Sequence, residues 1–92
     1  MNVTELAHWR YRVKAIEAEL PQLERWEREA SFDLVRWPDQ DYAQSLHADC
    51  KATLDFSRWL LEEARYMCEL GELSGLQIVG LGAVADRPRA PQ

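Results

Sequence analysis

The sequence is poor in the residues that cross-link or interrupt a chain. It has two cysteines, four glycines and four prolines in 92 residues. Cys50 and Cys68 fall in one expected helix about 27 Å apart, at about 1.5 Å per residue, which excludes an intramolecular disulfide. No segment approaches the roughly 18 apolar residues that a membrane-spanning helix needs, so a bilayer span is excluded. The N-terminal residues also lack the basic stretch and apolar region of a secretory signal, and we therefore expect a reduced, cytoplasmic setting.

Basic residues are in the minority. Eleven Lys and Arg stand against 16 Asp and Glu, and the formal net charge is −5. This balance argues against affinity for nucleic acid backbones and anionic membranes. A chain of this length buries only about 60% of the surface that its unfolded form exposes, so its core is marginal unless something extends it. We therefore expect self-association or a protein partner, with a basic surface on the partner.

Apolar residues recur at steps of three and four from Leu6 to Trp37, interrupted by the charged Glu27. This periodicity predicts one amphipathic helix, for which Thr4 is the expected N-cap. Pro21 removes a backbone donor and clashes with the preceding turn, yet the apolar stripe continues in phase across it. A kink is therefore favoured over a break into two collinear helices.

A second helix is expected from about Asp39 to Leu70. Pro38 ends the first helix, Asp39 can cap the second, and Gly71 is the expected stop. A connection this short forces the helices to pack antiparallel. The predicted fold is all-α: a long antiparallel helical hairpin with a kinked first helix, completed to a bundle in a homodimer or hetero-complex.

The expected domain division is 1–74 for the hairpin and 75–92 for an apolar, glycine-containing segment with a tail. Leu76 to Ala85 is apolar and contains β-branched residues and glycine, so we expect a short extended segment that is ordered by contact. The last seven residues are expected to form a disordered tail.

Catalytic and cofactor chemistry finds little support in the sequence. Gly80 and Gly82 match the spacing of a dinucleotide-binding turn, but only ten residues follow Gly82, too few for the helix and second strand of such a unit. His47 and Cys50 are three residues apart in the second helix, and two ligands do not make a metal site. We expect no enzyme activity, no cofactor and no metal.

Aromatic residues form the clearest candidate site. Phe56, Trp59 and Tyr66 flank the apolar arc of the second helix, and with Glu63 they are the candidate partner-binding residues. Surplus aromatic side chains beside a core stripe are typical of interfaces, although the same residues could cover the hairpin's own core. Trp26 also lies off the stripe of the first helix.

Two function hypotheses arise from these patterns. The first is a non-catalytic acidic protein that binds a protein partner, as an adaptor or as an inhibitor of the kind that phage and mobile elements use against host machinery. Residues 38 to 72 favour it, because they carry three basic and eight acidic side chains. The second is an oligomeric protein that binds a small anionic ligand or nucleotide through a basic stripe on the first helix, formed by Arg10, Lys14, Arg25 and Arg28.

Overall fold

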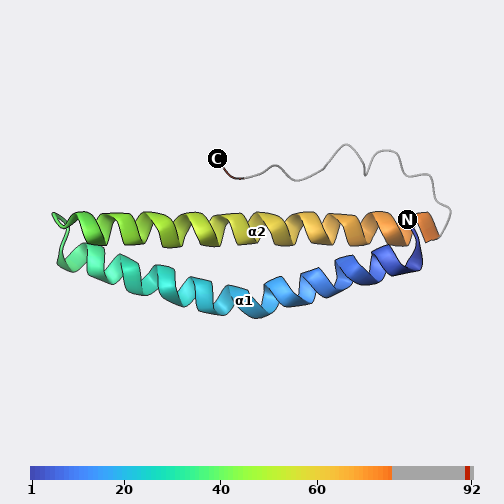
Figure 1. Ribbon diagram of the computed structural model, residues 1–92, viewed down its shortest axis with the longest axis horizontal. Helices are drawn as coiled ribbons and strands as arrows, with labels where there is room; N and C mark the ends of the chain where they lie inside the picture. Colours follow the sequence, from blue (N-terminus) through green and yellow to red (C-terminus); the bar gives the residue numbers. More distant parts are fainter. Residues whose placement is uncertain (76–90, 92) are drawn as a thin grey trace.

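The computed structural model describes residues 1–75 and residue 91 of the chain (Figure 1). Two long helices, α1 (Val3–Arg36) and α2 (Asp41–Gly75), pack against each other in antiparallel orientation. The longest dimension is 57 Å. No strand occurs in the described part of the chain, so the predicted all-α helical hairpin is confirmed.

The first helix begins earlier than predicted. Asn2 is the N-cap: its Oδ1 accepts a hydrogen bond of 2.8 Å from the backbone N–H of Glu5. The side-chain amide nitrogen of Asn2 also lies 3.4 Å from Oε1 of Glu5. A carboxylate is favourable at this position, because the N-terminal end of the helix dipole is positive. The prediction that Thr4 caps the helix was wrong. Asn is a stronger N-cap residue than Thr, and the side chain of Asn2 accepts a hydrogen bond from the free backbone N–H of Glu5.

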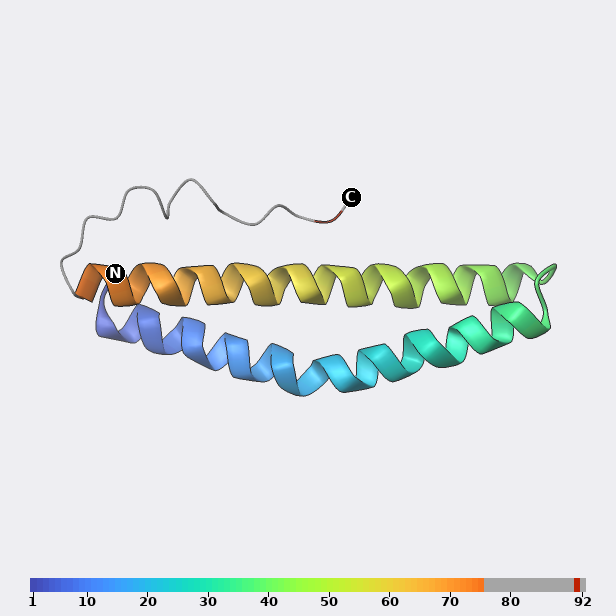
Figure 2. The same cartoon turned by 180° about the vertical axis from the view of Figure 1, so that it is seen from behind.

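Helix α1 runs through Pro21 without a break. Figure 1 and the reverse view in Figure 2 both show α1 bending, with its middle farthest from α2. Pro21 is exposed. A kink at Pro21 was predicted in preference to two separate helices, and the continuous, bent helix confirms it.

Residues 37–40 reverse the chain. The N–H of Trp37 donates to the carbonyl of Asp33 at 2.8 Å, and the N–H of Gln40 donates to the carbonyl of Trp37 at 3.2 Å. The side-chain amide of Gln44 then donates to the carbonyl of Pro38 at 2.8 Å. Helix α2 begins at Asp41, and the N–H of Gln44 donates to the carbonyl of Gln40, so the start predicted at Asp39 lies two residues too early and the cap predicted there lies one residue too early.

The predicted stop at Gly71 was also wrong, because α2 continues to Gly75. Gly71 is buried against the first turns of α1. A Cβ at this position would lie 2.7 Å from both Leu6 Cδ1 and Met1 Sδ. This glycine allows two helices to approach closely instead of ending one. The expected extended segment Leu76 to Ala85 lies outside the described residues.

The core between the helices is thin. Its buried cluster consists of Ile16, Leu61 and Ala64, and partly buried side chains pack around it: Trp9, Val13, Leu20 and Leu60. Within the described residues no large side chain falls below 2% exposure. Since small side chains fill much of the interface, burial inside the hairpin supplies limited stabilisation.

Candidate protein-binding site

The predicted aromatic site on α2 is only partly exposed. Phe56 is 49% exposed, and its ring lies 5.6 Å from that of Trp59, centroid to centroid. Trp59 is half-buried, and its indole N–H has no hydrogen-bond acceptor among the described residues. Tyr66 is buried, at 9% exposure, and Glu63 is half-buried. Of the four residues, Phe56 is therefore the one that a partner reaches most easily, and the binding role of the group stays a prediction.

The predicted basic stripe on α1 does not converge on one site. Arg10 and Lys14 line a shallow groove, together with Val13, Glu17, Arg65, Cys68, Glu69 and Glu72. Within this groove Arg10 pairs with Glu72 at 3.4 Å and Arg65 pairs with Glu17 at 3.6 Å. Its three cationic side chains face three carboxylates, which leaves no net positive charge for an anion.

The remaining cations of the stripe lie outside that groove. The guanidinium of Arg25 donates to Gln22 Oε1 at 3.4 Å, and Arg28 is exposed. Neither lines the groove that contains Arg10 and Lys14. The structure thus brings together two of the four predicted anion-binding residues.

A different site lies around Trp26, on the face between the two helices. Three adjoining hollows share this residue: both helices line two of them and α1 alone lines the third, and the hollow between Trp26 and Cys50 has a volume of about 150 Å³. Together they form what we call the Trp26 groove, lined by Glu19, Gln22, Leu23, Trp26, Glu29, Ala30, Asp33, Leu46, Asp49, Cys50 and Thr53. Trp26 itself is 51% exposed. The groove therefore offers an apolar floor and a large aromatic side chain to whatever binds there.

The rim of the Trp26 groove is acidic. Its charged members are the carboxylates of Glu19, Glu29, Asp33 and Asp49, and no Lys or Arg is among the lining residues that the structure describes. None of these four carboxylates forms an ion pair or hydrogen bond with another described side chain. Unpaired carboxylates around an apolar floor favour a ligand that is both apolar and cationic.

The sequence carried one signal of this groove, the position of Trp26 off the apolar stripe. What sequence reasoning missed is the acidic rim. Glu19, Glu29 and Asp33 share one side of α1 with Trp26 at helical spacing, and the packing of α1 on α2 adds Asp49.

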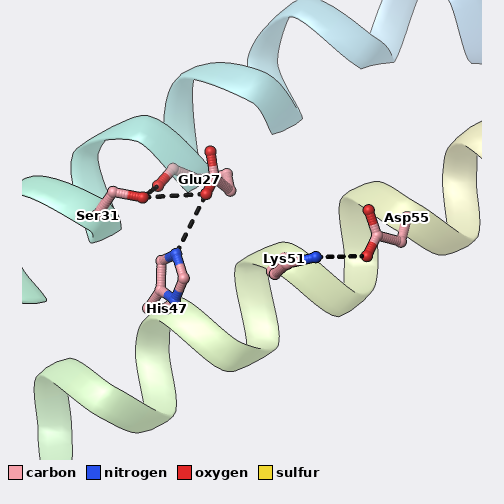
Figure 3. A network of polar contacts seen from close by, with 5 residues as sticks. All are labelled: Glu27, Ser31, His47, Lys51 and Asp55. Carbon is pink, nitrogen blue, oxygen red and sulfur yellow. Dashed lines mark hydrogen bonds and ion pairs between the residues drawn. The ribbon is translucent and has the colours of Figure 1, made fainter.

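A polar contact crosses the interface at Glu27, the residue that interrupts the apolar stripe (Figure 3). Its Oε1 accepts a hydrogen bond of 3.0 Å from Ser31 Oγ and lies 3.2 Å from Nε2 of His47 on α2. These bonds compensate for the partial burial of the carboxylate. His47 thus contacts Glu27, and the structure shows no group of three potential metal ligands within its described residues.

Burial raises the pKa of the Cys68 thiol above its ordinary value. The nearby Arg10 opposes this rise in pKa, and Glu72 adds to it. A thiol with a raised pKa stays protonated at neutral pH and is a poor nucleophile.

Among the described residues, neither helix is apolar enough over a sufficient length to cross a membrane. Comparison of the chain with protein-family models, with curated proteins and with solved structures found no match.

Proposed function

We propose that this chain is a non-catalytic protein that binds a protein partner with a basic surface, acting as an adaptor or an inhibitor. The observation that supports the proposal is the Trp26 groove, in which a half-exposed tryptophan lies among four carboxylates that pair with no other side chain of the described residues. Buried aromatic anchors supply much of the energy of protein interfaces. Carboxylates around them select and steer a cationic partner.

Charge favours a different protein over a second copy of the same chain on this face. In a two-fold dimer each surface meets itself, so Glu19, Glu29, Asp33 and Asp49 of one copy would face the same carboxylates of the other. The formal net charge of −5 adds to this repulsion. The groove therefore supports the predicted hetero-complex, while a homodimer through another face stays a prediction.

The proposal is tested with variants of the full chain that share the same fold. Trp26→Ala removes the aromatic anchor, and Tyr11→Ala is a matched control, because Tyr11 is 71% exposed on the same helix and does not line the groove. Proteins captured from the source cells by the unmodified chain are purified, and their affinities for each variant are measured by calorimetry at low and high salt.

We expect a partner whose binding weakens with salt, is strongly reduced by Trp26→Ala and is unchanged by Tyr11→Ala. A third variant, Phe56→Ala with Trp59→Ala, measures whether the predicted aromatic site on α2 contributes. Partner binding that is unaffected both by Trp26→Ala and by salt would contradict the proposal.

A further inference from the structure

Resting on the proposed function, we infer that the Trp26 groove binds an amphipathic α-helix of the partner, with Lys or Arg beside its apolar stripe, and so forms a three-helix bundle. The first reason is the shape of the groove. The part that both helices line extends along α1 from Leu23 to Asp33, which is ten positions and about 15 Å at about 1.5 Å per residue. About three turns of a helix fit along this length, and the α1 side continues to Glu19.

Backbone hydrogen bonding decides between a helical and an extended ligand. The walls of the groove come from α1 and α2, whose backbone N–H and C=O groups are bonded within each helix. An extended peptide would find no free backbone groups to pair with, and burial of its own unpaired groups would be unfavourable. A helix satisfies its own backbone and presents only side chains to the groove.

The apolar floor matches the side chains that such a helix would present. Leu23 and Trp26 face the groove from α1, and Leu46, Cys50 and Thr53 face it from α2. On α2, steps of three and four separate these residues, the spacing of a helical face. Apolar residues at positions i, i+3, i+4 and i+7 of a third helix would therefore lie over this floor.

The acidic rim fixes the charge of the ligand. Glu19, Glu29 and Asp33 lie on the α1 side of the groove and Asp49 lies on the α2 side. A helix with cationic residues on both flanks of its apolar stripe would meet carboxylates on both sides. The face of an indole such as Trp26 also attracts Lys and Arg.

The test uses synthetic peptides as probes and the full chain as the receptor. The helical probe has about 18 residues, long enough for measurable helicity, with Leu at the apolar positions and Lys or Arg on both flanks. One control peptide has the same composition in an order that has no apolar face. A second replaces every Lys and Arg of the probe by Glu.

Two measurements locate the probe on the protein. Affinity is measured by fluorescence anisotropy of labelled peptides. The four tryptophans give separate indole N–H signals in a proton–nitrogen correlation spectrum, which Trp→Phe variants assign. We expect the Trp26 signal to shift on titration with the probe and the Trp9 signal to stay in place.

We expect the helical probe to bind about tenfold or more tightly than either control peptide, and Trp26→Ala to weaken it by about tenfold or more. Tyr11→Ala should leave the affinity unchanged. Equal binding of the probe and the scrambled peptide, or an affinity that Trp26→Ala does not alter, would overturn the inference, as would no binding of the probe. A natural partner that still binds in a Trp26-dependent manner would then leave the proposed function standing.

Discussion

Replacement of Pro21 by alanine should stabilise the hairpin and straighten α1. Pro21 lies in the middle of a helix of 34 residues and is exposed. It cannot donate a backbone hydrogen bond to the carbonyl of Glu17, and its ring clashes with that carbonyl unless the helix bends. The bend seen in Figure 1 relieves part of this clash and leaves the carbonyl without its helical partner.

The expected gain can be estimated from the helix itself. In a helix interior proline is about 3 kcal/mol less favourable than alanine. Part of this free energy is already recovered by the bend, and the contacts of α1 with α2 on either side of Pro21 are adapted to the bent shape. We therefore expect Pro21→Ala to raise the free energy of unfolding by about 1–2 kcal/mol, against a total of about 5–14 kcal/mol for a chain of this size. The midpoint of thermal unfolding should rise by about 4–8 °C for each kcal/mol.

Urea unfolding followed by far-ultraviolet circular dichroism measures this change, at several protein concentrations so that association is detected. The control is Gln22→Ala, an adjacent substitution without a proline, for which we expect a change within about 0.5 kcal/mol. If Pro21→Ala leaves the stability unchanged or lowers it, the bend is imposed by packing on α2 and the reasoning is refuted. Straightening of α1 should also weaken binding of the helical probe, because the Trp26 groove lies beside the bend.

Three further predictions concern the two-helix interface. Ala64→Leu should lower the free energy of unfolding by about 1–3 kcal/mol in the same urea assay, because the alanine is 1% exposed and the added carbons have no space; a leucine at an exposed alanine of α2 is the control. Gly71→Val should destabilise the hairpin by less, about 1 kcal/mol, since its Cβ would lie 2.7 Å from Leu6 Cδ1 and Met1 Sδ, which are ends of flexible side chains that can shift, and an unchanged melting temperature would contradict this. Arg10→Gln should raise the pKa of the Cys68 thiol further, because the guanidinium lowers that pKa; the pH dependence of the alkylation rate measures it, and an unchanged or lowered pKa would count against the assignment.

The sequence predicts the two helices well because their periodicity records burial directly. Steps of three and four persist across Pro21, so the continuous helix is expected from the pattern. The ends of the helices are harder to predict, because each depends on competition or contact. Asn2 is the cap in place of Thr4, because its Oδ1 accepts the hydrogen bond from the N–H of Glu5. Gly71 lies within α2, at a position where Leu6 of α1 packs against it.

The candidate site was harder to predict than the fold. Helical periodicity separates buried from exposed positions on one helix, but it does not show how far the second helix covers each residue. Tyr66 was therefore predicted as a partner-binding residue, with cover of the hairpin's own core as the alternative, and it is buried. Three carboxylates of the acidic rim share one side of α1, whereas the addition of Asp49 and the apolar floor from α2 depend on how the two helices align.

Adjacent residues on α1 invert the pattern that a hairpin needs for its own stability. Trp26 is apolar and half-exposed, whereas Glu27 is charged and lies toward α2, with 29% of its side chain exposed. A helix selected only for packing would carry the reverse, and such local conflicts are expected where a protein retains function at the expense of stability.

The double variant Trp26→Gln with Glu27→Leu places the polar residue at the exposed position and the apolar residue toward α2. It therefore separates the stability of the hairpin from binding of a partner. The leucine gains apolar burial on the stripe, while the contacts of Glu27 with Ser31 and His47 are lost. We expect a net gain of about 1 kcal/mol in the free energy of unfolding, since burial of a leucine exceeds the net contribution of such hydrogen bonds. Binding of the helical probe should be lost at the same time. A variant that is less stable than the natural chain would show that Glu27 serves the fold, and the inverted pattern would then carry no information about binding.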